Sequence, residues 1–116
     1  MNQTINQAIG TAALEMELQT IQVERQISPA RLSELGIHGW PTWKDGVGTR
    51  QLDYDAAEKS YFLDGSATLS MTNGASINVD KGDLVIIPAG KCQWIVHQLV
   101  RRHYRSDALS PACCII

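Results

Sequence analysis

The chain has 116 residues, of which 44% are hydrophobic and 19% are charged, and its formal net charge is -2 at pH 7. This length fits a single domain, and the composition is that of a globular protein rather than a disordered one. Twelve acidic residues against ten basic ones disfavour a general nucleic-acid binder or a binder of anionic membranes, since both usually carry a basic excess.

The first 19 residues are rich in Gln, Asn and Ala. Ile5, Ile9, Ala12 and Met16 lie three or four positions apart, which indicates a short helix. A frayed extension is the alternative. We therefore predict an N-terminal extension over residues 1–19, helical or not, and one domain over residues 20–116.

The segment after Thr20 predicts a strand and then a short helix. Ile21 and Val23 alternate with polar residues, as in a half-buried strand. Ser28 can cap a helix whose first position is Pro29, and Gly36 can supply its left-handed stop.

From residue 37 onward the sequence predicts β-structure. Ala67, Leu69 and Met71 alternate with Ser and Thr, and the run 84–87 is apolar throughout. Turn signals recur at short intervals, which indicates about eight short strands in a sandwich or barrel. They are Asp45-Gly46, Asp64-Gly65, Asn73-Gly74, Lys81-Gly82 and Pro88-Ala89-Gly90. We expect Gly65 and Gly82 to lie where the chain reverses.

Three groups of residues carry a family resemblance. They are Trp40-Pro41-Thr42-Trp43; the segment from Tyr54 through Glu58 to Asp64-Gly65; and the segment from Lys81-Gly82-Asp83 through Pro88-Ala89-Gly90 to Cys92-Gln93-Trp94 and Arg101-Arg102-His103-Tyr104. Between about Ile21 and Arg105 the chain resembles the cupin superfamily, and more narrowly the small single-domain cupins grouped with (S)-ureidoglycine aminohydrolase. The resemblance implies an all-β, cupin-type jelly-roll barrel with a short N-terminal helix, a pocket at one mouth, and a homodimer.

In metal-binding cupins the resemblance implies two His and one Glu from the first motif and one His from the second. The corresponding positions here are Leu52, Tyr54, Glu58, and either Gln93 or Cys92, depending on where the second motif is anchored. The imidazoles that suit a transition metal are missing. We therefore assign no metal ligand and leave the cofactor unknown, a divalent metal or none.

Glu58 and Tyr54 are the candidate catalytic residues. Glu58 is a ligand-binding group or general acid–base inside the barrel, or else a solvated carboxylate beside Lys59. Tyr54 offers its phenol to a ligand or fills the barrel with its ring. The further candidates for the ligand pocket are Leu52, Gln93, Cys92, Trp43, Trp94 and His97.

Each of these pocket candidates has a second interpretation. The tryptophans, Trp40 included, could instead be core residues, and Cys92 is a reactive thiol or a buried inert one. Gln93 and His97 share one strand face and Cys92 and Trp94 the other. The latter face, which is more apolar, is expected inside, and that would leave His97 on the surface.

The remaining polar residues are expected to be structural. Arg101, Arg102 and Arg105 form the basic cluster of the chain. It would bind an anion if one arginine pointed into the barrel, but a charged, solvated edge strand is the expected arrangement. His38 and His103 are read as structural or surface residues.

The cysteine usage and the N-terminus predict a cytoplasmic protein. Cys92, Cys113 and Cys114 are an odd number with an adjacent pair, which is a poor disulfide framework. Residues 1–7 contain no Lys or Arg, unlike a secretory signal, and no run approaches the roughly 20 apolar residues of a membrane span. Cys113 and Cys114 are expected in a terminal strand or a dimer contact.

The function predicted from these patterns is binding of a small molecule in the barrel. The site suits a hydrolase or an isomerase that acts on a small polar metabolite through Glu58 and Tyr54. The alternative is a metal-free ligand-sensing or assembly protein without catalytic activity.

Overall fold

The structure, a computed structural model, describes residues 20–72 and 74–107. The predicted extension 1–19 and the Cys113-Cys114 pair lie outside the described residues. The elements are β1 (Gln22–Glu24), α2 (Pro29–Leu35), the 3-10 helix η1 (Ile37–Gly39), β2 (Thr42–Asp45), β3 (Gly48–Tyr54), β4 (Glu58–Met71), β5 (Ser76–Asp80), β6 (Leu84–Ile87) and β7 (Gly90–Ser106). Across this part of the chain, no helix has the length and apolar character needed to cross a membrane.

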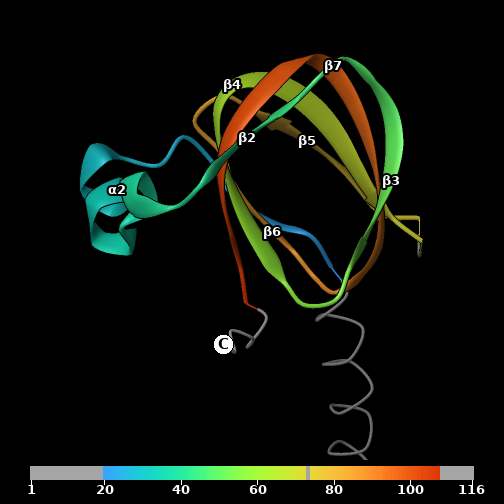
Figure 1. The fold of residues 1–116 in the computed structure, drawn as a ribbon, viewed down its shortest axis with the longest axis horizontal. Helices are drawn as coiled ribbons and strands as arrows, with labels where there is room; N and C mark the ends of the chain where they lie inside the picture. Colours follow the sequence, from blue (N-terminus) through green and yellow to red (C-terminus); the bar gives the residue numbers. More distant parts are fainter. Residues whose placement is uncertain (1–19, 73, 108–116) are drawn as a thin grey trace, which may run out of the picture.

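Two long strands, β4 and β7, form the centre of the fold. They pair antiparallel from Glu58 opposite Ser106 to Met71 opposite Cys92. Both β2 and β3 pair with the other side of β7, both β5 and β6 pair with the other side of β4, and β1 pairs with β6. Figure 1 shows β4 and β7 arching around a common interior, so that the sheet curves into a barrel. The all-β barrel with a short helix is therefore confirmed.

The sheet bends where the register of the long strands shifts. The pairing of β4 with β7 is irregular between Phe62 and Ala67. The partners of β7 change from β2 to β3 at the same level, and those of β4 change from β6 to β5. The bend divides the barrel into two walls. Wall A holds β1, β6, the first half of β4, the second half of β7, and β2; wall B holds β5, the second half of β4, the first half of β7, and β3.

The expectation that the chain reverses at Gly65 and Gly82 was wrong. β4 continues through Gly65, whose φ is 92°. Gly82 lies in a turn between β5 and β6, but both of these strands run antiparallel to β4, so the chain resumes its direction. The same holds for Asp45-Gly46, between β2 and β3. The positive φ that favours glycine in a hairpin also suits a bulge, which bends a strand without reversing it.

Other turn signals mark what they predicted. The dipeptide 73–74 separates the antiparallel partners β4 and β5, as expected of a hairpin. Pro88 and Ala89 separate β6 from β7. Ser28 Oγ accepts a hydrogen bond from the Arg31 amide at 3.1 Å, and Gly36 ends α2 with φ 67°. The predicted helix and the preceding strand β1 are thus confirmed.

The core fills the space between the two walls. Ala67, Leu69 and Met71 are buried, as their alternation predicted, and three of the four residues of β6 are buried. Phe62 of wall A stacks on Trp94 of wall B with ring centroids 5.9 Å apart. The hydrophobic contacts between the walls therefore place Trp94 at the centre of the barrel.

Gly65→Ala should destabilise the fold strongly. A Cβ at this position would collide with the backbone carbonyl of Leu99, and φ is in the region that side chains avoid. We expect a loss of about 2 kcal/mol or more in the free energy of unfolding, measured by urea denaturation. The matched control is Gly46→Ala, where a Cβ meets no atom within 4 Å. Equal losses in the two variants would contradict this account of the bend.

Candidate functional site

The interior of the barrel contains a buried arginine. Arg102, on β7, is 5% exposed. Its Nε donates to Asp45 Oδ2 at 2.8 Å, and its Nη1 donates to Glu58 Oε1 at 3.1 Å and to Ser60 Oγ at 2.9 Å. A buried charge is tolerated only when it is paired and hydrogen-bonded. Asp45, Glu58 and Ser60 supply those partners.

Aromatic residues surround this guanidinium. Its Cζ lies 4.8 Å from the centroid of the Trp94 ring and 5.6 Å from that of Tyr104. Trp94 Nε1 in turn donates to Tyr54 Oη at 3.0 Å. We call Asp45, Tyr54, Glu58, Ser60, Trp94 and Arg102 the interior cluster. It joins wall A, which carries Arg102, to wall B, which carries Tyr54 and Trp94.

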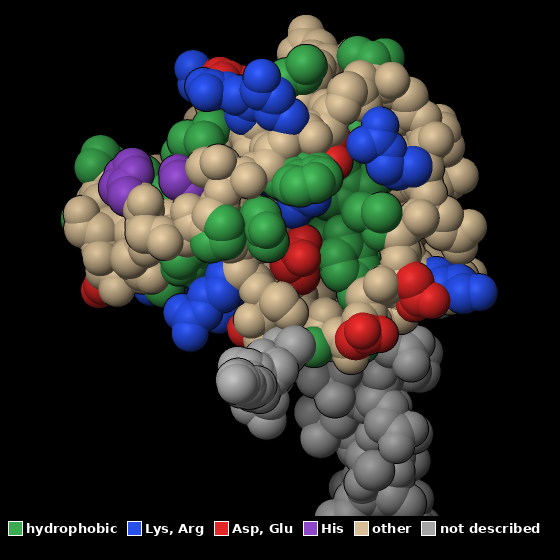
Figure 2. Space-filling model, viewed as in Figure 1, with side chains coloured by type: hydrophobic (Ala, Val, Ile, Leu, Met, Phe, Trp, Pro, Cys, Tyr) green, Lys and Arg blue, Asp and Glu red, His purple; other side chains and the backbone are tan. Residues whose placement is uncertain are grey.

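The interior cluster lies below the mouth of the barrel. Figure 2 looks into that mouth and shows an acidic and a basic side chain inside a hollow lined by hydrophobic ones. The side chain of Glu58 is 14% exposed, whereas that of Asp45 is 3% exposed. Glu58 is therefore the more accessible carboxylate of the interior cluster.

The surroundings shift the pKa values of three members. Burial raises the pKa of Glu58 above its ordinary value, although Arg102 opposes the shift. Burial also raises the pKa of Tyr54, and the charge of Glu58 adds to that. Burial alone would lower the pKa of Arg102, but Asp45 and Glu58 raise it. Arg102 thus stays charged and Tyr54 stays protonated, while Glu58 titrates closer to neutral pH.

Strand alternation separates the predicted pocket residues into two groups. Cys92 and Trp94 are fully buried, and Leu52 packs against the core. Gln93 and His97 are exposed on the outer face and do not line the barrel interior, which for His97 is the placement expected from the more apolar face of Cys92 and Trp94. The apolar side chains of 92, 94 and 96 occupy the interior and turn the intervening residues outward.

Two histidines and one cysteine singled out from the sequence have structural surroundings. His97 Nε2 lies 2.8 Å from Thr68 Oγ1 on the outer face. Burial raises the pKa of Cys92 to about 11, so its thiol stays protonated and has the character of an inert core residue. His103 is buried, and its Nδ1 lies 2.9 Å from the Trp40 carbonyl oxygen.

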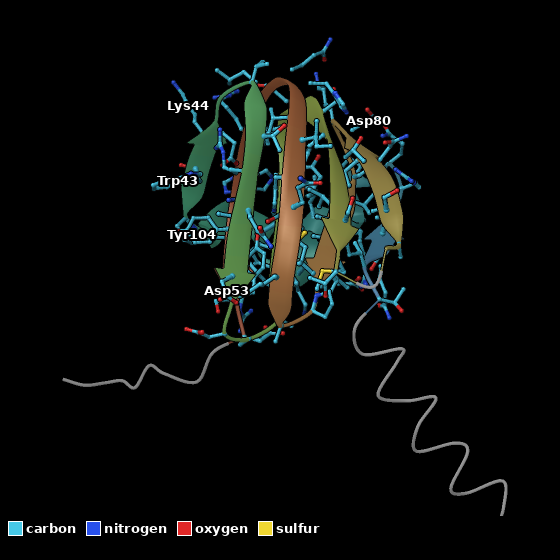
Figure 3. The ribbon with its side chains drawn as sticks, turned by 90° about the vertical axis from the view of Figure 1, so that its right-hand side faces the viewer. Trp43, Lys44, Asp53, Asp80 and Tyr104 are labelled. Carbon is cyan, nitrogen blue, oxygen red and sulfur yellow. The ribbon has the colours of Figure 1, made fainter. Side chains whose placement is uncertain are left out.

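Trp43 is not a core residue. It lies on β2 and is 56% exposed. Figure 3 shows Trp43, Lys44 and Tyr104 along one edge of the molecule, with Asp80 at the opposite edge. Since Trp43 is opposite Arg102 in the register, it lies beside the mouth of the barrel.

Sequence reasoning missed the charged centre of the site. The prediction of a solvated edge strand was wrong for Arg102, because β7 lies between β4 and β2. Asp45 was read only as part of a turn, and Ser60 was not singled out. A signal existed in the alternation of Val100, Arg102 and Tyr104, which places Arg102 on the face of apolar residues.

The residues present do not fit a transition metal. Of the positions that the family pattern would use, Leu52 has no donor atom, Tyr54 has its phenol protonated, and Cys92 has its thiol protonated. Within residues 20–72 and 74–107, no group of three or more His, Cys, Asp or Glu side chains could hold a metal ion. We therefore derive no chemical step through a metal at this site.

Comparison with known proteins places this barrel in a family. The model of the EutQ-like cupin domain matches residues 32–104. A solved DUF861 family protein from Thermotoga maritima is 34% identical, covers 75% of this chain and 99% of its own, and superposes with a TM-score of 0.71. No curated protein matches the chain.

More distant solved structures share the fold alone. The EutQ protein of Clostridium difficile is 20% identical, with a TM-score of 0.50, and the match covers 72% of this chain and 64% of that one. A protein of unknown function (DUF1255) from Acidithiobacillus ferrooxidans is 24% identical, with a TM-score of 0.50, over 54% of this chain and 61% of its own.

The raised pKa of Glu58 should appear in the pH dependence of stability. The folded state holds the Glu58 proton to higher pH than the unfolded chain, so this group stabilises the fold less as pH rises from its ordinary pKa of 4.5 toward the raised one. Glu58→Gln lacks this titration. The unfolding free energy of Glu58→Gln relative to that of the wild type should therefore increase as the pH rises above about 4.5.

Urea denaturation at several pH values measures that difference. Glu34→Gln, on the exposed part of α2, is the matched control for replacing a carboxylate by an amide. A difference for Glu58→Gln that stays constant, or moves the other way with pH, would contradict the raised pKa.

Proposed function

The chain belongs to the EutQ-like cupin family, and we propose that it binds a small polar metabolite at the mouth of its barrel and exchanges a proton with it through Glu58, without a metal. The observation that carries the proposal is the position of Glu58. It is the accessible carboxylate of the interior cluster, its pKa is raised, and Arg102 orients it. An accessible, oriented carboxylate with a raised pKa suits a general base and acid.

Two donors support this role. Arg102 Nη2 has no hydrogen-bond partner among the described residues. Because no buried side-chain nitrogen in that part of the chain lacks a partner, Nη2 is at least partly exposed, and we propose that it faces the hollow. Tyr54 Oη accepts its bond from Trp94, which leaves its own hydrogen free to be donated. A substrate oxygen can therefore be polarised beside Glu58.

These groups suit a substrate with a carbonyl or carboxyl oxygen next to a labile C–H. The Glu58 carboxylate would take the proton from carbon while Arg102 and Tyr54 donate hydrogen bonds to the oxygen, which gains negative charge. Return of the proton to a neighbouring atom would complete an isomerisation. In a hydrolysis, Glu58 would instead take a proton from the attacking water.

The narrower resemblance to (S)-ureidoglycine aminohydrolase favours hydrolysis. That resemblance implies metal-assisted chemistry, and the interior residues do not fit a metal. We therefore give isomerisation the first place. The homodimer, the cytoplasmic location and the 20–116 domain boundary stay predictions.

A second candidate function is ligand sensing without chemistry. It is favoured by the ion pair itself, since Arg102 and Glu58 satisfy each other's charges inside the barrel. A ligand could then be recognised by Arg102 and Tyr54 while Glu58 holds its partner in place.

A metabolite screen followed by proton exchange separates the two functions. Small hydroxy acids, keto acids and ureides are first tested for raising the melting temperature of the wild type, Glu58→Gln and Glu34→Gln. Each ligand found is then incubated with protein in D2O, and deuterium uptake at its carbon atoms is followed by NMR. Enzymatic proton transfer predicts uptake in the wild type and in Glu34→Gln, reduced about 100-fold or more in Glu58→Gln.

Other outcomes decide against the proposal. Uptake that is equal in wild type and Glu58→Gln would remove Glu58 as the acid–base group. Thermal stabilisation with no exchange or hydrolysis would favour the sensing function. Absence of any stabilising ligand would count against both.

A further inference from the structure

The outer face of wall A has a second hollow, across the sheet from the interior cluster. Its volume is about 280 Å³, and it is lined by Thr42, Trp43, Lys44, Leu63 and Arg101. Lys44 and Arg101 are the chain neighbours of Asp45 and Arg102, whose side chains meet inside the barrel. Because side chains alternate along strands, Lys44 and Arg101 lie on the opposite side of the sheet.

Two positive charges face each other across this hollow. Lys44 of β2 is directly opposite Arg101 of β7 in the register. Like charges at directly opposite positions destabilise an antiparallel pair of strands. Asp64 Oδ2 accepts hydrogen bonds from Arg101 Nε at 2.9 Å and from Arg101 Nη2 at 2.7 Å. This carboxylate therefore compensates the charge of Arg101 but not that of Lys44. Among the described residues Lys44 has no ion-pair partner, so the group of three carries one net positive charge.

The other residues that line the outer hollow carry no charge. Leu63 is partly buried and Trp43 is more than half exposed, while Thr42 offers a hydroxyl. Figure 3 shows Lys44 and Trp43 projecting from the same edge strand. In Figure 2, basic side chains gather beside an acidic one and hydrophobic ones near the top, where β2, β4 and β7 lie in Figure 1. The hollow thus combines positive charge with apolar surface.

We propose that this outer hollow binds a small organic oxyanion. The oxyanion would accept hydrogen bonds from Lys44, Arg101 and Thr42, and its apolar part would pack on Leu63 and on the part of Trp43 that borders the hollow. A volume of about 280 Å³ is at the small end of ligand sites and leaves room for more than an inorganic ion. Binding of an anion would also relieve the repulsion between Lys44 and Arg101.

Phenyl phosphate is a suitable probe, with inorganic phosphate and benzyl alcohol as partial analogues. Each is titrated into the full chain at constant ionic strength while backbone amide NMR shifts are followed. We expect saturable shifts at β2, Leu63 and Arg101 for phenyl phosphate, and weaker binding of both analogues. Lys44→Gln should weaken phenyl phosphate about tenfold, the effect of one charge-assisted hydrogen bond. The matched control is Lys91→Gln, since Lys91 is an exposed lysine in the part of β7 that pairs with β3. This substitution should change the affinity for phenyl phosphate less than twofold.

A separate readout confirms that a loss of binding is not a loss of folding. Lys44→Gln removes a like-charge contact, so its unfolding free energy should equal or exceed that of the wild type. Glu58→Gln should bind phenyl phosphate as the wild type does, which separates this site from the proposed function. The proposal is overturned if phenyl phosphate does not saturate, if either analogue binds as tightly, or if Lys44→Gln and Lys91→Gln have equal effects.

Discussion

The candidate site depends on one buried cation. Arg102 is held between Asp45 and Glu58, and its guanidinium lies over Trp94. An arginine in this position depends on such partners, because an unpaired buried charge costs several kcal/mol. The same contacts orient Glu58 and place Tyr54 near it. Stability of the interior and geometry of the candidate chemistry therefore have a common origin.

This arrangement also explains how a cupin barrel can have a polar interior without imidazole ligands. The positions that the family pattern reserves for histidines hold Leu52 and Tyr54, and the second motif places Cys92 inside. The guanidinium supplies the positive charge in the interior. It stays protonated, and its planar shape fixes the directions of its hydrogen-bond donors. Glu58 occupies the position of the glutamate in the family pattern, but its partner is the Arg102 side chain and not a metal ion.

The sequence predicted the fold more completely than the site. The cap at Ser28, the alternation around Leu69 and the apolar run of β6 are local signals, and local backbone preference decided each of them. Gly65 and Gly82 were recognised as special positions but given the wrong geometry, since a positive φ serves a bulge as well as a reversal. Arg102 was missed because its environment is set by β2 and β4, which are distant in sequence.

The breaks in the strands lie at one level, around Gly46, Gly65 and Gly82, and this alignment has a mechanical consequence. Together they bend the sheet along one line, with hydrogen-bonded strands on either side. Arg102 connects the two walls, because its Cζ lies 4.8 Å from the centroid of the Trp94 ring. Because Arg102 lies on one wall and Trp94 on the other, the angle between the walls at these breaks sets the spacing of the groups around Glu58.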